Sequence, residues 1–291
     1  INEIWINKTL IIIICFFGFI GGYLNYSKNT EGLYDKYISK MKKKYYIFIV
    51  TSFLILSCNN NSKKVSEVIS PEIMEESSSE DKWVSLIQDN TMEGWHYYQD
   101  NGKKTGWDIK DGVLTFTSDK ATGKGDKSLV SDKEYTSFKI HLEWKVSSMS
   151  NSGFFWGVKE DMKYEFPFVT GPEIQILDPE MPDGPLTQAG ALYGMIAPSK
   201  WVTKPAGEWN SYDITIDHNS NEGIVVHNGT KIVEFPLSGD VWDKMVEPTK
   251  FNNCDEEPWQ NCDFGKFKTG KIAIQDHPGV ISFRNIKILE L

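Results

Sequence analysis

Arginine is nearly absent from this chain of 291 residues, because Arg284 is its one arginine. Histidine and cysteine are also scarce, at five and four residues. Without residues 1–57 the chain carries 24 basic against 37 acidic residues, a net charge of −13. Such a surface repels phosphate backbones, and no basic residues alternate with the tryptophans to offset this. The composition therefore argues against nucleic acid as a partner.

The pattern of a signal peptide lies inside the chain. Met41 is followed by three lysines, an apolar run over residues 45–56, and then Ser57-Cys58. A small residue before the cysteine resembles the lipobox of bacterial lipoproteins. We expect a signal peptide over residues 41–57 and a lipidated Cys58, which would anchor the protein to the outer membrane, periplasmic or surface-exposed. The alternative for Cys58 is an ordinary buried cysteine.

The segments on either side of this signal differ in character. Residues 1–40 contain another apolar stretch, residues 9–23, and we interpret them as an over-extended start; a true extra transmembrane segment is the alternative. Residues 58–82 are polar and lack aromatic residues, so they cannot bury a core. We expect a flexible tether there, followed by one folded domain over residues 83–291.

Two of the four cysteines lie within this domain. Cys254 and Cys262 are eight positions apart in a loop-like stretch, which in an exported protein predicts a local disulfide. A zinc site would need two more ligands nearby, and the histidines are scattered. We assign no cofactor. Carboxylates and a histidine could hold a divalent metal, but no spacing specifies Ca²⁺ or Zn²⁺.

The domain has strand signals throughout and neither a long helical period nor an internal repeat. Asp111-Gly112 and Asn228-Gly229 are typical of hairpin turns. Apolar and polar residues alternate over residues 141–146 and 212–217, as expected for two antiparallel sheets that each bury one face. We therefore predict an all-β sandwich. Its strands are expected at residues 107–110, 113–117, 138–146, 153–158, 173–177, 212–217, 224–227, 231–235, 271–275 and 280–289.

The strand at residues 173–177 points to a site. Alternation places Glu173 and Gln175 on one face and Ile174 and Ile176 on the other. The apolar face is expected to pack in the core. The polar face, turned to solvent in the middle of a domain, indicates the floor of a cleft for a polar ligand. The alternative for Glu173 is a surface acid paired with a lysine.

A set of motifs follows in a fixed order through the domain from Trp83 to the C-terminus. They are Gly106-Trp107, residues 143–145, 151–153, 173–178, 189–193 and 207–210, Asn228-Gly229, residues 275–277 and residues 283–286. In this order the set resembles the 3-keto-disaccharide hydrolase family. The resemblance implies a concanavalin A-like jelly-roll sandwich and cleavage of glycosides whose sugar is oxidised at carbon 3.

The predicted chemistry differs from that of ordinary glycosidases. A ketone at C3 makes the C2 proton acidic, so a base can remove it, the enolate can expel the aglycone from C1, and water can add back. Laminarinase-type glucanases carry E-x-D-x-x-E on a strand, whereas this chain has Glu173, Gln175 and Asp178 at those positions. The central amide argues against a double-displacement mechanism.

The catalytic candidates are Glu173, His277 and Lys145. His277 ends a predicted strand on the face of Gln275, and its ordinary pKa is near neutrality; a turn histidine bonded to backbone is the alternative. Lys145 shares a face with Glu143 and could steady an enolate or form a surface ion pair.

The substrate-binding candidates are weighed one by one. Gln175 could bind a sugar hydroxyl or the ketone, and Asp178 could join it or cap a turn. Glu143 could bind substrate or form a surface ion pair. Arg284 could bind a carboxylate of the protein or a substrate oxygen. Asn151 could bind substrate or cap a turn, and Trp156 could stack on a sugar or lie in the core. We predict a 3-keto-glycoside hydrolase; the alternative is a non-catalytic carbohydrate-binding module.

Overall fold

The computed structural model describes residues 82–88, 90–99 and 104–291, which fall within the second of two units of the chain, Glu76–Leu291. The predicted signal peptide, Cys58 and the tether up to residue 81 lie outside the described residues. Among the residues described, none of the helices is long and apolar enough to cross a bilayer.

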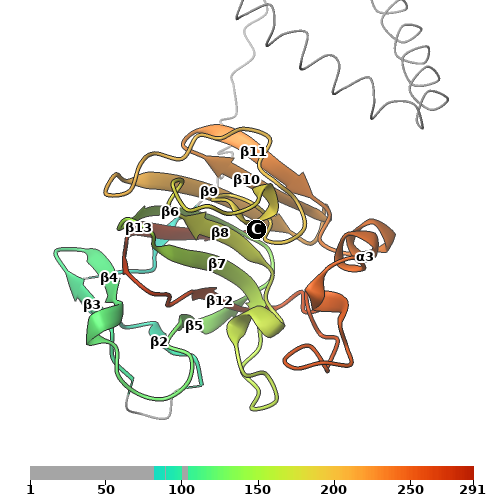
Figure 1. The fold of residues 1–291 in the computed structure, drawn as a ribbon, viewed down its shortest axis with the longest axis horizontal. Helices are drawn as coiled ribbons and strands as arrows, with labels where there is room; N and C mark the ends of the chain where they lie inside the picture. Colours follow the sequence, from blue (N-terminus) through green and yellow to red (C-terminus); the bar gives the residue numbers. More distant parts are fainter. Residues whose placement is uncertain (1–81, 89, 100–103) are drawn as a thin grey trace, which may run out of the picture. The chain divides into compact units, whose positions relative to one another are not determined.

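Two antiparallel sheets build the fold (Figure 1). In spatial order, the larger sheet contains β11 (Thr230–Phe235), β10 (Glu222–His227), β9 (Asn210–Asp217), β6 (Phe138–Val146), β13 (Val280–Glu290), β4 (Val113–Thr117) and β3 (Trp107–Lys110), with β1 (Val84–Ser85) paired to β13. The smaller sheet contains β2 (Trp95–Tyr97), β5 (Leu129–Tyr135), β12 (Gly270–Ile274), β7 (Asn151–Val158) and β8 (Glu173–Leu177).

The helices of the described residues are short and lie in the connections. They are α3 (Asp240–Val246) and the 3-10 helices η3 (Ser118–Lys120), η4 (Pro167–Val169), η5 (Pro185–Thr187) and η6 (Lys250–Asn252). Between α3 and β12, a disulfide joins Cys254 to Cys262, the pairing that the sequence predicts.

Both predicted hairpins are present. Asp111 and Gly112 connect β3 to β4, and Asn228 and Gly229 connect β10 to β11. All four residues have positive φ, as a two-residue type I′ turn requires. Asparagine, aspartate and glycine tolerate this conformation, which explains why the sequence signal is reliable here.

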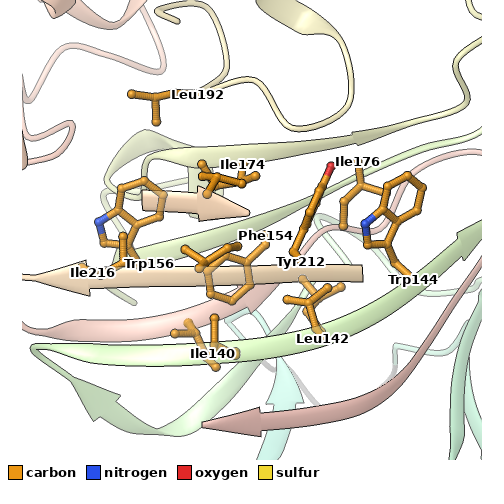
Figure 2. Packing of buried hydrophobic residues seen from close by; sticks show 14 of the residues in the cluster. Ile140, Leu142, Trp144, Phe154, Trp156, Ile174, Ile176, Leu192, Tyr212 and Ile216 are labelled. Atoms are coloured by element: carbon orange, nitrogen blue, oxygen red, sulfur yellow. The ribbon is translucent and has the colours of Figure 1, made fainter. Parts of the chain in front are cut away.

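The core lies between the two sheets. On β6 the side chains of Leu142 and Trp144 are buried, while Glu143 between them is only partly covered. Figure 2 shows these core residues packed with Ile174 and Ile176 from β8. The predicted all-β jelly-roll sandwich of two antiparallel sheets is therefore confirmed.

The outer side of β8 differs from the prediction. All five residues of this strand are buried, including Glu173 and Gln175. The chain after β8 returns along its free edge, where Gln175 N donates to Ala191 O and Tyr193 N donates to Glu173 O. The edge of β8 is thus paired and both polar side chains are buried, so the expectation of a solvent-facing acid was wrong.

Candidate active site

Two rows of side chains cross the outer face of the five-stranded sheet, because opposite residues of antiparallel strands share a face. Neighbouring strands lie about 4.8 Å apart, so a row across three strands spans roughly 10 Å. One row contains Tyr193, Glu173, Phe155, Ala273, Val130 and His96. The next contains Gln175, Gly153, Gln275, Ser128 and Tyr98.

Glu173 begins β8, and its side chain lies over Gly153 of β7, in a space that we call the recess. Only 8% of its surface is exposed, and Gly153 leaves room for its side chain, since a Cβ there would lie 2.0 Å from Glu173 Oε1. The carboxyl has no hydrogen-bond partner among the described residues. Burial raises the pKa of Glu173 to about 8, against the opposing effect of the Lys250 charge. Glu173 is therefore mostly protonated at neutral pH and able to donate a proton.

Amide groups lie on the same face. The oxygens Gln175 Oε1, Gln275 Oε1 and Asn151 Oδ1 are buried and lack a hydrogen-bond partner in the described part of the chain. Asn151 begins β7 and shares the outer face with Gly153. Buried polar atoms are normally paired, so these three acceptors fit a ligand that brings its own donors, such as hydroxyl groups.

Tyr193 and Lys250 complete the recess. Lys250 Nζ lies 4.9 Å from the centroid of the Tyr193 ring. Burial raises the pKa of Tyr193, and the charges of Glu173 and Asp183 raise it further. Sequence reasoning gave neither residue a role. The motif at residues 189–193 could have drawn attention to Tyr193, but Lys250 stands in a loop region that carries no signal.

His277 follows the end of β12, two residues after Gln275. Burial lowers its pKa, although the charge of Asp276 acts in the opposite direction. The imidazole is therefore neutral at pH 7 and able to accept a proton. Within the described residues, no hydrogen bond or ion pair joins His277 to Glu173.

A pair of aspartates beside His277 was also missed by sequence reasoning. Ser128 N donates to Asp126 Oδ1 at 2.8 Å, and Ser128 Oγ donates to Asp276 Oδ1 at 3.1 Å. Burial, together with the charge of Asp276, raises the pKa of Asp126 to about 7. One serine thus holds two acids close together on the sheet face that carries Gln275.

Lys145, Glu143 and Arg284 lie elsewhere, on the outer face of the eight-stranded sheet. Arg284 donates from Nε to Glu143 Oε2 at 2.7 Å, and its Cζ lies 4.1 Å from the centroid of the Trp209 ring. Lys145 Nζ lies 4.7 Å from the same ring. The whole core separates this face from Glu173. The grouping of Lys145, Glu143 and Arg284 with Glu173 was therefore wrong, because alternation shows that a residue points outward but not from which sheet.

The family model described as a 3-keto-alpha-glucoside-1,2-lyase-like domain matches residues 82–289. This chain belongs to that family. A 3-keto-disaccharide hydrolase from Bacteroides thetaiotaomicron is 29% identical over 237 residues, which cover 72% of this chain and 78% of the relative.

Two solved structures are also similar to this chain. A Parabacteroides distasonis structure described as a presumed glycosyl hydrolase has 29% identity and a TM-score of 0.63, covering 72% of this chain and 95% of the other. A second one from the same organism has 26% identity and a TM-score of 0.53, covering 72% of this chain and 100% of the other. These relationships support a glycoside hydrolase-like function.

In this 3-keto-alpha-glucoside-1,2-lyase-like domain, two further predicted substrate contacts are structural. Trp156 points into the core, where its ring lies 5.8 Å from that of Phe235 (Figure 2). Asp178 is fully buried, and its carboxylate accepts hydrogen bonds from Met149 N and Glu180 N. The indole packs in the core and the Asp178 carboxylate is already engaged by backbone donors, so these two assignments to the substrate were wrong.

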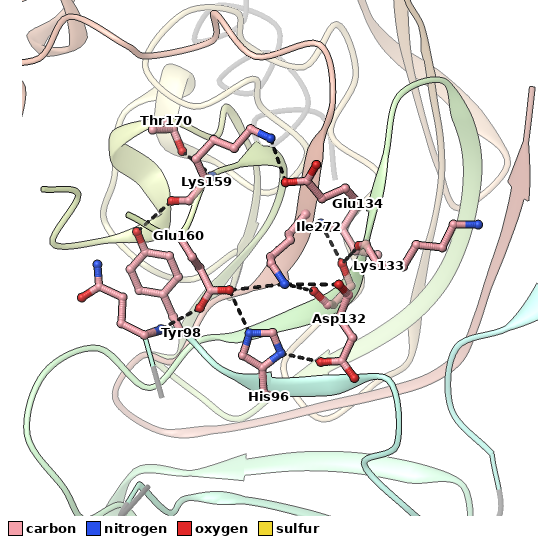
Figure 3. Close-up of polar contacts among 12 residues, drawn as sticks. His96, Tyr98, Asp132, Lys133, Glu134, Lys159, Glu160, Thr170 and Ile272 are labelled. Atoms are coloured by element: carbon pink, nitrogen blue, oxygen red, sulfur yellow. Dashed lines mark hydrogen bonds and ion pairs between the residues drawn. The ribbon is translucent and has the colours of Figure 1, made fainter. Parts of the chain in front are cut away.

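The far end of the outer face carries a closed polar network (Figure 3). His96 Nδ1 lies 2.5 Å from Asp132 Oδ1, and His96 Nε2 lies 2.8 Å from Glu160 Oε2. Lys271 Nζ lies 3.3 Å from the same Glu160 oxygen. Hydrogen bonds and ion pairs already engage these groups. As for metals, no group of three or more His, Cys, Asp or Glu side chains in the described part of the chain is arranged to hold one.

Proposed function

We propose that the recess around Glu173 binds and cleaves 3-keto-glycosides. The observation that carries the proposal is a buried carboxyl without a hydrogen-bond partner among the described residues, on the same face as the unpartnered amide oxygens of Gln175 and Gln275. Burial raises its pKa to about 8. An acid kept neutral by burial can act as a proton donor at pH 7. The amide oxygens supply acceptors for sugar hydroxyls. Membership of the 3-keto-alpha-glucoside-1,2-lyase-like family supports the substrate class.

The reaction proceeds by elimination and addition. A base takes the proton from C2, and the electrons of that bond form an enolate with the C3 ketone. As the ketone re-forms, a C1=C2 double bond forms and the C1–O bond to the aglycone breaks, with a proton passing to the departing oxygen. Water then adds at C1 and a proton returns to C2, so the products are a free 3-keto sugar and the aglycone alcohol.

Three side chains take the roles that this route requires. Glu173 gives the proton to the departing oxygen, because it is protonated at neutral pH. Lys250 and its positive charge stabilise the enolate oxygen. His277 is the candidate base, because burial lowers its pKa and leaves the imidazole neutral at pH 7. It follows Gln275 by two residues. Preorganised charge of this kind stabilises the transition state more than the ground state.

The test compares Glu173→Gln with the wild-type protein on methyl 3-keto-glucoside and 3-keto-trehalose, with released sugar as the readout. Removing a general acid costs about 10²- to 10⁴-fold in kcat. The matched control is Glu143→Gln on the opposite face, which we expect to retain full activity. Binding of both substrates by the wild-type protein without turnover, at several pH values and with divalent metals supplied, would contradict the proposal and favour a carbohydrate-binding module.

A further inference from the structure

The segment that follows β8 forms a pocket that shares no lining residue with the recess. Its volume is 380 Å³. Trp201 lines the pocket and is 60% exposed, more than Trp83 at 41%. The remaining lining residues are Pro179, Asp183, Pro185, Gln188 and Thr203.

Hydrogen bonds fix this pocket to the strand that bears Glu173. Gln188 O accepts from Ala191 N at 3.0 Å, and Gly190 N donates to Gln175 O at 2.8 Å. Leu186 O accepts from Gly194 N at 2.9 Å, one residue after Tyr193. The pocket wall and the recess wall are therefore parts of one continuous segment, residues 183–194.

Tyr193 belongs to the same segment and connects the two sites. The charges of Asp183 and Glu173 both act on the Tyr193 phenol and raise its pKa. Tyr193 N also donates a hydrogen bond to Glu173 O, so this residue joins the pocket segment to the recess. A molecule bound across both would pass this phenol.

The polar groups of the pocket are partly free. Asp183 Oδ1 accepts from Gly184 N, while Oδ2 has no hydrogen-bond partner in the described part of the chain. Gln188 donates from Nε2 to Asp183 O, and its Oε1 is likewise without a partner there. An exposed aromatic face beside free acceptors matches a pyranose, which offers an apolar C–H face and a rim of hydroxyl donors.

We propose that the Trp201 pocket binds the sugar on the leaving-group side of a disaccharide substrate, with its C–H face on the indole and its hydroxyls on Asp183 and Gln188. The inference rests on the proposed function of the Glu173 recess, which would hold the oxidised sugar. It makes the protein selective for glycosides of sugars over glycosides of small alcohols, because only a sugar aglycone fills the pocket.

The experiment measures KM for 3-keto-trehalose and for methyl 3-keto-glucoside with Trp201→Ala, Trp201→Phe and Trp83→Ala. Trp83 is 41% exposed and precedes β1 of the other sheet, so it is the matched control. Trp201→Ala should raise KM for the disaccharide about tenfold and leave the methyl glycoside unchanged, and Trp201→Phe should recover part of the loss. An equal change for both substrates, or no change for either, would overturn the proposal.

A binding measurement separates this inference from the proposed function. Glucose, the leaving sugar of 3-keto-trehalose, is titrated into the wild-type and Trp201→Ala proteins by saturation-transfer NMR. If the wild-type protein hydrolyses neither substrate, the proposed function fails, yet glucose binding that depends on Trp201 and not on Trp83 would still support a sugar pocket. Binding of equal strength in both proteins, or none in either, would reject the pocket.

Discussion

Glu143 and Glu173 occupy comparable positions on opposite faces of the sandwich, and their surroundings differ completely. Each lies on a strand whose alternate residues pack in the core. Glu143 receives hydrogen bonds from Arg284 Nε and Asn285 Nδ2, at 2.7 and 2.5 Å. Glu173 has no hydrogen-bond partner among the described residues and is almost fully covered.

The pKa values of the two acids move in opposite directions for this reason. Burial acts to raise the pKa of both acids. At Glu143 the hydrogen bonds from Asn285 and Arg284, together with the charge of Arg284, outweigh burial, and the pKa is lowered. At Glu173 only the charge of Lys250 opposes burial, and the pKa rises to about 8. Perturbed acids without partners are concentrated at functional sites, whereas paired acids are usually structural.

Among substitutions that leave both glutamates in place, the largest effect is expected from Gly153→Ala, which would push Glu173 out of its recess. The added Cβ would lie 2.0 Å from Glu173 Oε1. A catalytic group displaced by about 1 Å can cost roughly 100-fold in rate. We therefore expect a loss of about 100-fold in kcat on methyl 3-keto-glucoside with the fold retained, measured by steady-state kinetics and circular dichroism.

Gly184→Ala is the matched control for this substitution. Gly184 has a negative φ, and the nearest atom to an added Cβ would be Thr187 Oγ1 at 3.9 Å. Activity on the methyl glycoside should stay at the wild-type level. Full activity of Gly153→Ala would mean that the position of Glu173 does not matter for turnover.

A smaller effect, on stability alone, is expected on the opposite face. Arg284→Met removes the partner of Glu143, and Lys145→Met removes a cation from the Trp209 ring. Arg284 and Glu143 are partly exposed, so we expect Arg284→Met to lower the free energy of unfolding by about 1 kcal/mol and Lys145→Met by less. Urea denaturation measures this loss, and kcat/KM should not change. A fall in kcat/KM of either variant would bring this face back into the site.

Much of the fold could be predicted because its signals are local. Asp111-Gly112 and Asn228-Gly229 adopt positive φ, and the alternation on β6 and β9 marks the face in contact with the core. The strand β5 was missed. Its register with β12 shifts near Ile272, and three exposed residues follow one another in it, so the alternation that marks a strand is lost.

The site was predicted only in part, for a physical reason. Alternation identified Glu173 and Gln175 as partners on one face, and register brings Gln275 to the same face. Lys250 approaches from η6, far along the chain, and no local pattern encodes such a contact. The same limit explains why Lys145 was wrongly grouped with Glu173. Two strands with identical alternation can turn their polar residues to opposite sides of a sandwich.

The dependence of stability on pH separates the two glutamates by sign. The folded-state pKa of Glu173 lies above its ordinary value of 4.5, so its contribution to stability is complete below pH 4.5 and is lost as the pH rises through about 8. Glu143 has a lowered pKa, so its contribution is present above its ordinary value and is lost as the pH falls. Each unit of pKa difference corresponds to about 1.4 kcal/mol.

Urea denaturation of Glu173→Gln and Glu143→Gln across this pH range tests the difference. Glu173→Gln should gain stability relative to the wild-type protein as the pH rises, because glutamine cannot ionise in the recess. Glu143→Gln should be less stable than the wild-type protein near neutral pH, with the deficit shrinking toward low pH. Lys250→Met sharpens the test: without this positive charge the pKa of Glu173 rises further, so the loss of stability continues to a higher pH. Parallel pH profiles for the two glutamine variants would show that the two acids share one environment, which contradicts the contrast between the faces.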